Sequence, residues 1–265
     1  MCELFAISSM LPTKVTFSLE EFALHGGRTA RHRDGWGLAF FDGVYAQVFR
    51  EAEPSADSQW MIFLREHQHL SRCIISHIRY ATVGERALRN TQPFSRELGG
   101  QRHIFCHNGN LDNIDSLSTL NRFKPIGETD SEYAFCYLLA ELETLWSKGP
   151  PGLQKRVEVI EKVFKKLAEL GPANFLYSDG DSLYAFANKR TQADGQMKPP
   201  GMYYLTRNCH RDVDSQTLSG VDIDSSSAEL EQELVLFASV PLSNENWLPF
   251  MSNQLIVTQN GKVMT

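Results

Sequence analysis

The sequence lacks the features that would place it in a membrane, in a secretory route or on nucleic acid. No apolar run approaches the roughly 20 residues that a membrane-spanning helix needs. The amino end has no basic stretch followed by a long apolar one, so we expect no signal peptide. Acidic residues outnumber basic ones by 32 to 26, and the net charge of −6 disfavours binding to the phosphates of nucleic acid.

Metal-binding and disulfide patterns are also missing. The histidines include no HExxH and no spacing typical of a zinc site. The five cysteines are an odd number and form no CxxC pair, which argues against a disulfide framework. We therefore expect a protein of the reducing cytoplasm without a bound metal. The cysteines are Cys2, Cys73, Cys106, Cys136 and Cys209.

What is present is typical of a globular domain, with 42% hydrophobic and 22% charged residues in 265. Apolar runs predict strands at 4–8, 38–41, 73–78, 103–107, 202–206 and 233–242, and hairpins at 174–188 and 254–265. Helices are predicted at 20–25, 57–70, 129–146 and 153–170. The segment 211–233 is rich in Asp, Ser and Glu and is interpreted as a solvated excursion. Strands followed by paired helices and then strands favour an α+β fold over alternating βαβ units.

The clearest helix start is TDSE at 129–132. Thr129 is the expected cap, and Glu132 three residues later completes the spacing of a capping box. Asp130 lies in the first turn, where an acid stabilises a helix by complementing its dipole. Its alternative role is to bind an ammonium group of a ligand.

Cys2 raises a different question. It can be a small buried hydrophobe. If Met1 is removed, however, the same residue carries a thiol and a free α-amino group. That amino group has an ordinary pKa of about 7.7–8.0, which suits a general base at neutral pH.

A thiol that attacks an amide needs donors for the oxyanion. In CHNG, Asn108 can donate a side-chain N–H and Gly109 a backbone N–H. The alternative is a tight turn, since Asn-Gly is the commonest hairpin dipeptide. In HIRYAT, Arg79 offers a planar fork that suits a carboxylate, or else it pairs with a surface acid.

Taken together and in this order, these segments resemble the class II glutamine amidotransferases, which are N-terminal-nucleophile hydrolases. The segments are Cys2, DGWG at 34–37, HIRYAT at 77–82, HNG at 107–109 and TDSE at 129–132. The likeness is closest to the short, stand-alone branch with HxDGWG, and it covers nearly the whole chain. It implies a four-layer αββα sandwich in a single domain, residues 2–265, from which Met1 is removed.

The resemblance also implies the chemistry. Cys2 would attack the γ-amide of glutamine or of a γ-glutamyl compound while its α-amino group handles the proton, and Asn108 and Gly109 would stabilise the oxyanion. Ammonia or an amine would leave, and water would release glutamate from the thioester. No cofactor is implied. The residues expected to bind or line the substrate are Arg79, Tyr80, Thr82 and Asp130.

Some points stay open. Both Arg31 and Arg33 are candidates for the arginine that precedes the loop aspartate in the hexosamine and purine enzymes. Tyr80 and Val83 stand where the hexosamine enzyme has tryptophan and histidine, so the pocket differs in shape and leaves room for a larger γ-glutamyl substrate. No synthase domain remains to accept ammonia, so the protein would serve a separate partner subunit or simply hydrolyse its substrate. The alternative is a non-catalytic regulatory or scaffold protein with this fold.

Overall fold

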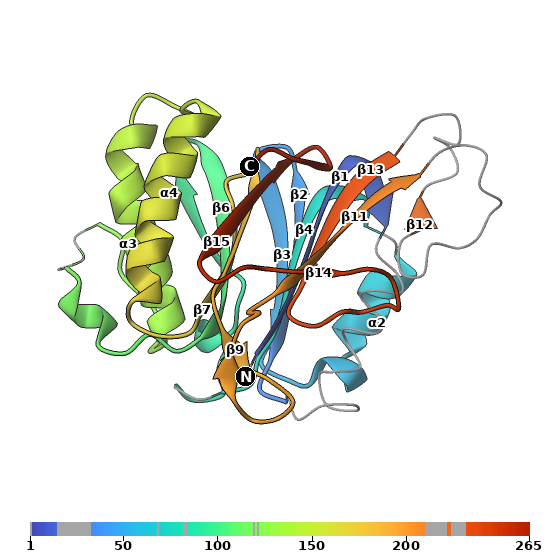
Figure 1. Ribbon diagram of the computed structural model, residues 1–265, viewed down its shortest axis with the longest axis horizontal. Coiled ribbons are helices and arrows are strands. Elements are labelled where there is room, and N and C mark those ends of the chain that lie inside the picture. Colours follow the sequence, from blue (N-terminus) through green and yellow to red (C-terminus); the bar gives the residue numbers. More distant parts are fainter. Residues whose placement is uncertain are drawn as a thin grey trace.

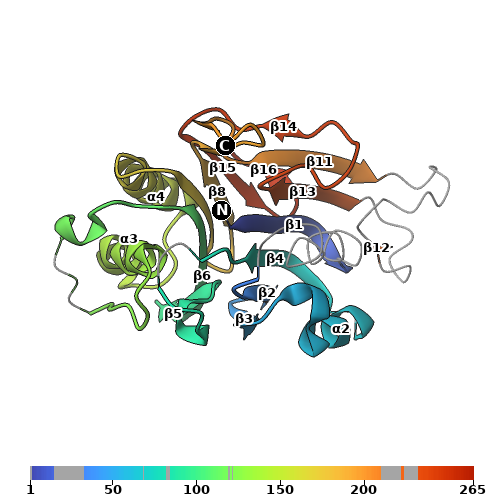
Figure 2. The same cartoon turned by 90° about the horizontal axis from the view of Figure 1, so that it is seen from below.

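Two large β-sheets lie face to face in the computed structural model, with helices on the outer sides (Figures 1 and 2). The structure describes residues 2–14, 33–67, 69–81, 84–118, 120, 122–209, 222–223 and 232–265. Every strand pair of these sheets within the described part of the chain is antiparallel.

The first sheet has β1 at its centre, with β13 and β4 as its neighbours. Its order is β14 (Leu248–Pro249), β11 (Tyr203–Cys209), β13 (Gln232–Ala238), β1 (Glu3–Lys14), β4 (Ser71–Ile78), β2 (Trp36–Asp42) and β3 (Tyr45–Glu51). The short β12 (Asp222–Ile223) also pairs with β1.

In the second sheet, β6 is the strand next to one of the two edge strands. Its order is β16 (Lys262–Val263), β15 (Gln254–Gln259), β8 (Leu183–Ala187), β7 (Ala173–Ser178), β6 (Gln101–Gly109) and β5 (Phe94–Leu98). A separate ribbon joins β9 (Arg190–Thr191) to β10 (Met197–Lys198).

Three apolar layers hold the sandwich together, and the side-chain alternation of the strands assigns residues to them. In β6, Ile104 and Cys106 pack against the first sheet, whereas Phe105 packs against the helices α3 (Asp130–Trp146) and α4 (Leu153–Ala168). The outer face of the first sheet packs against α2 (Gln59–Glu66) through Met61 and Leu64. The expected α+β, four-layer αββα architecture is therefore confirmed.

The three predicted helices that fall on described residues agree with the structure to within a few residues. Thr129 caps α3 by accepting a hydrogen bond from the N–H of Glu132. The reciprocal half of the capping box is wrong, because the Glu132 carboxylate accepts from the N–H groups of Ile126 and Gly127 instead. The helix predicted at 57–70 is shorter, since Ser58 caps α2 and its last residue is Glu66.

Other elements were either missed or lie outside what the structure describes. Three short 3-10 turns connect the main elements, at Ser55–Asp57, Leu88–Asn90 and Ile114–Ser116. The helix predicted at 20–25 lies outside the described residues, as does most of the excursion predicted at 211–233. No helix in the described ranges is long and apolar enough to cross a membrane.

Candidate active site

The register of the first sheet places three separate segments at one end of neighbouring strands. Ile78, the last residue of β4, pairs with Glu3 at the start of β1 and with Trp36 at the start of β2. Because β4 runs antiparallel to both neighbours, the residue before β1 and the loop before β2 meet the chain that follows β4. Cys2 and Asp34 therefore lie beside Arg79, as the resemblance requires of these motifs.

A small pocket opens at this junction, with a volume of about 30 Å³. That volume holds a water molecule but not a glutamine side chain, so a substrate must widen it. The lining residues come from both sheets and from the start of α3: Cys2, Arg79, Tyr80, Ala81, Asn90, Gln92, His107, Gly109, Thr129, Asp130 and Ser131.

The Cys2 sulfur is held by the backbone of Tyr80. The Tyr80 N–H donates to Cys2 Sγ at 3.3 Å, and Sγ lies 3.4 Å from the Tyr80 carbonyl oxygen, which accepts its S–H. Burial raises the pKa of the Cys2 thiol, and the Tyr80 hydrogen bond and the charge of Arg79 oppose that rise. The thiol form of this sulfur is therefore favoured over the thiolate at neutral pH.

Arg79 is buried, and the loop that follows it occupies part of its fork. The guanidinium donates to the carbonyl oxygen of Glu85 at 3.0 Å and to that of Gly84 at 3.2 Å. Burial lowers the pKa of Arg79, while Cys2 and Asp34 raise it. The side chain is fixed at the pocket wall, and a substrate carboxylate would compete with these carbonyl groups.

Asn108 and Gly109 are the last two residues of β6 and pair with Asn174 and Ala173 of β7. The alternative interpretation of this dipeptide as a hairpin turn is therefore wrong. Gly109 is needed for close packing, because a Cβ there would lie 1.8 Å from the carbonyl oxygen of Pro172. Its backbone borders the Cys2 pocket.

Asn108 is fully buried, and its side chain does not border the pocket in this structure. Its Nδ2 donates to Ser239 Oγ at 3.3 Å, and Ser239 in turn accepts from the N–H of Leu4 at 3.0 Å. The Asn108 Oδ1 atom has no hydrogen-bond partner among the described residues. Ser239 thus links the strand that carries the candidate nucleophile to the strand that carries the candidate oxyanion donor.

Asp130 begins α3 at the far side of the pocket. Its Oδ2 accepts from the N–H of Leu111 at 2.8 Å and lies 3.9 Å from His107 Nδ1. The Nε2 atom of His107 faces the Pro172 carbonyl at 3.2 Å and must carry the proton, so Nδ1 accepts from Ser131 Oγ at 2.9 Å. Burial lowers the pKa of His107, which keeps this ring neutral beside the Asp130 carboxylate.

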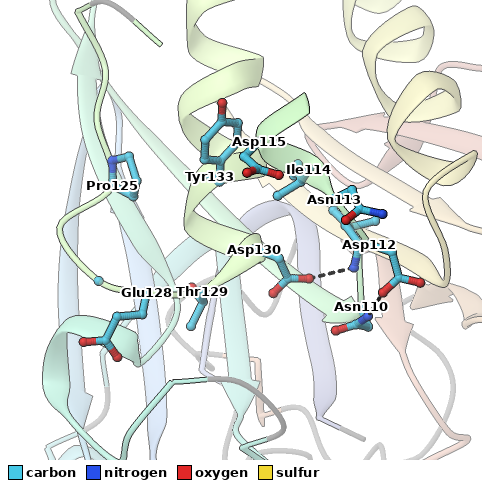
Figure 3. Close-up of a pocket in the computed structure, with 12 residues that line it drawn as sticks. Asn110, Asp112, Asn113, Ile114, Asp115, Pro125, Glu128, Thr129, Asp130 and Tyr133 are labelled. Carbon is cyan, nitrogen blue, oxygen red and sulfur yellow. Dashed lines mark hydrogen bonds between the residues drawn. The ribbon is translucent and has the colours of Figure 1, made fainter. Parts of the chain in front are cut away.

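A larger cavity of about 440 Å³ adjoins the small pocket, and the two share Thr129 and Asp130. Figure 3 shows Asp130 between the start of α3 and the 110–115 segment, with its hydrogen bond to that segment. Asp112, Asp115 and Glu128 also border this cavity, and no Lys or Arg within the described ranges does so. Asp130 therefore borders both the small pocket and the larger cavity.

Several pocket residues were not found from the sequence. The side chain of Gln92 holds the backbone of His107 from both sides, donating to its carbonyl at 3.1 Å and accepting from its N–H at 2.6 Å. Ser131 and Gln92 gave no spacing signal. Ser131 lies inside the TDSE segment but was given no role of its own, and Gln92 stands outside every motif.

The remaining expected residues are placed as follows. The Tyr80 side chain is 37% exposed, so it is the Tyr80 backbone that contacts the sulfur. Arg33 is exposed, and Arg31, Thr82, Val83 and Met1 lie outside the described residues. Among the residues that the structure describes, no group of three or more potential ligands could hold a metal ion.

Comparisons with known proteins find matches over nearly the whole chain. The family described as class II glutamine amidotransferases matches residues 1–265. The Escherichia coli protein YafJ, named as a candidate glutamine amidotransferase, is 34% identical over 256 residues, which are 96% of each chain. A Haemophilus influenzae protein, also named as a candidate glutamine amidotransferase, is 34% identical over 263 residues, covering 99% of this chain and 85% of its own.

Solved structures share the fold. The crystal structure of a predicted glutamine amidotransferase from Pseudomonas aeruginosa has a TM-score of 0.68 at 28% identity, with both chains covered completely. Glutamine phosphoribosylpyrophosphate amidotransferase of Bacillus subtilis has a TM-score of 0.59 at 14% identity, covering 99% of this chain and 48% of its own, and shows the fold alone. The fold is thus the amidotransferase form of the N-terminal-nucleophile hydrolases.

Proposed function

Because the chain belongs to the class II glutamine amidotransferase family, we propose that it hydrolyses the γ-amide of glutamine or of a γ-glutamyl compound. The observation that supports this most directly is the pocket in which Cys2, Arg79, Gly109 and Asp130 meet from distant parts of the chain. Such a set provides a nucleophile, an oxyanion donor and two opposite charges for the ends of an amino acid.

The first half of the reaction forms a thioester. With Met1 removed, the α-amino group of Cys2 takes the thiol proton as Sγ bonds to the amide carbon. The Gly109 N–H stabilises the oxyanion that develops, and an Asn108 side-chain N–H does so once the substrate has widened the pocket as far as this amide. The C–N bond then breaks, and ammonia or an amine leaves with the proton that the α-amino group returns.

The second half releases the product. Water attacks the γ-glutamyl thioester, the C–S bond breaks, and the Cys2 thiol is restored as glutamate leaves. Arg79 would hold the α-carboxylate and Asp130 the α-ammonium group throughout, while the backbone of Tyr80 keeps the sulfur in place. A thiol whose pKa is raised fits a mechanism in which a base acts only at the moment of attack.

Delivery of the ammonia to a separate subunit would use the same half-reactions. A comparison of glutamate release with and without a candidate acceptor protein separates delivery from simple hydrolysis. Dependence of turnover on the acceptor would support delivery, and a rate that no acceptor changes would support hydrolysis.

The test is a screen of L-glutamine and γ-glutamyl amides for glutamate release, with intact-mass measurement of Met1 removal. Cys2→Ala should abolish release without loss of folding. Cys73→Ala is the matched control, because Cys73 is a partly buried cysteine of β4 that does not line the pocket. Equal activity of Cys2→Ala and parent protein would refute the mechanism, and binding without release would favour a regulatory role.

A further inference from the structure

The DGWG segment has no role in the proposed reaction, yet its first residue contacts the chain that holds the sulfur. Asp34 precedes β2, and its carboxylate Oδ2 accepts from the N–H of Ala81 at 2.8 Å. The Asp34 N–H donates to the carbonyl oxygen of Arg79 at 3.3 Å, and the Arg79 N–H donates to the Gly35 carbonyl oxygen at 2.8 Å. The Arg79 guanidinium also donates to the Asp34 carbonyl oxygen at 3.4 Å, so the 34–35 and 79–81 segments are tied together at four points.

These bonds act on the peptide groups that carry the sulfur's two partners. A trans peptide unit is planar, and its C=O and N–H point in opposite directions. In the peptide unit between Arg79 and Tyr80, the carbonyl accepts a hydrogen bond from the Asp34 N–H, and the N–H donates to Cys2 Sγ. In the peptide unit between Tyr80 and Ala81, the N–H donates to the Asp34 carboxylate, and the carbonyl accepts from the Cys2 S–H.

We propose that Asp34 is a positioning residue for Cys2: through the two peptide units on either side of Tyr80, it fixes the N–H and C=O groups that hold the sulfur. This assignment rests on the proposed role of Cys2 as nucleophile. Asp34 acts through the backbone and needs no contact with the substrate.

The negative charge of the Asp34 carboxylate adds an electrostatic effect to this geometric one. A carboxylate on the Ala81 N–H polarises that peptide unit and makes the Tyr80 carbonyl a stronger acceptor for the thiol S–H. Besides Cys2, the charged side chains that border the pocket are Arg79 and Asp130, and the other titratable ones are His107 and Tyr80. Asp34 therefore favours the thiol over the thiolate through the Tyr80–Ala81 peptide unit, whereas the charged groups that border the pocket act on the sulfur directly across it.

Two substitutions separate geometry from charge. Asp34→Asn keeps an acceptor for the Ala81 N–H but removes the charge, whereas Asp34→Ala removes both. Asp42→Asn is the matched control, because Asp42 is an exposed acid at the other end of the same strand.

Alkylation of Cys2 by iodoacetamide, followed by mass spectrometry of the amino-terminal peptide from pH 6 to 10, reports the thiolate directly. In Asp34→Asn we expect the midpoint to move down by about half a pH unit, with the parent's melting temperature retained. Asp42→Asn should keep the parent profile. A profile of Asp34→Asn that coincides with that of the parent would overturn the proposal.

Turnover of L-glutamine supplies the second readout. Asp34→Ala should lower kcat about tenfold at an unchanged KM, and Asp34→Asn should restore kcat to within about threefold of the parent. Equal losses in the two variants, or a loss confined to KM, would contradict a positioning role. Alkylation needs no turnover, so a parent protein that releases no glutamate would refute the proposed function while the profiles still decide the role of Asp34.

Discussion

The sharpest prediction for the proposed mechanism concerns Asn108. Its Nδ2 atom carries two N–H groups, and one of them already donates to Ser239 Oγ. The other is the donor that the proposed oxyanion site requires. Removal of a single donor of this kind raises the barrier by about 3–4 kcal/mol, so Asn108→Ala should lower kcat by about 10²- to 10³-fold with little change in KM.

The structure predicts a much smaller effect on folding. Asn108→Ala removes one hydrogen bond, worth about 1 kcal/mol, and also removes the buried Oδ1 atom, whose lack of a partner among the described residues costs about 1–3 kcal/mol. Removal of the unpaired Oδ1 atom therefore opposes the losses of the hydrogen bond and of packing, so the free energy of unfolding should change by only about 1 kcal/mol. A large loss of kcat at nearly constant stability is the expected signature.

Steady-state kinetics with L-glutamine and urea unfolding measure the two quantities. Ser239→Ala is the companion variant, because it keeps the amide but removes the acceptor that orients it, and it should lower kcat about fivefold. If Asn108→Ala retained kcat to within threefold of the parent, the oxyanion role would be refuted.

Three further results are expected. Arg79→Lys should lower kcat/KM for glutamine about 100-fold, because an ammonium cannot replace a bidentate fork; an unchanged value would exclude the carboxylate role. Gly109→Ala should destabilise the fold by about 3 kcal/mol in urea unfolding, since the new Cβ meets the Pro172 carbonyl at 1.8 Å, and a neutral result would contradict that packing. Burial lowers the pKa of His103 to about 4, so its neutral form stabilises the fold above pH 6.5, and up to about 3 kcal/mol is lost as the pH falls from 6.5 to 4. His103→Gln should flatten that part of the pH-stability curve, and an equal slope in both proteins would refute the assignment.

The sequence predicts the long elements well because their side chains follow a regular period. In α4, Ile160, Phe164 and Leu167 recur on one face and are all buried. Prediction from local spacing was less successful where groups from elsewhere in the chain competed for the same side chain. Glu132 has capping-box spacing, but Arg96 and the N–H groups before the helix take its carboxylate.

The site depends on residues that local patterns cannot bring together. Nothing in the spacing of Cys2, Arg79 and Asp130 shows that they share a pocket, and the family resemblance supplied that expectation. The Asn-Gly dipeptide shows the limit of local propensity, because strand pairing with β7 overrides its preference for a turn. A contact between a side chain and a distant backbone group, such as that of the Asp34 carboxylate with the Ala81 N–H, depends on how neighbouring strands are aligned. It has no signature in the sequence.

The central place of β1 has a consequence for the lifetime of the chain end. The amino end of a protein is ordinarily where fraying and exopeptidase trimming begin. Here Glu3 pairs with Ile78 on one side, and Phe5 pairs with Ala238 on the other. In a chain that starts at Cys2, as the proposed mechanism requires, digestion beyond that residue would need β1 to separate from both neighbours, so the terminus should resist aminopeptidases for as long as the sheet stays closed.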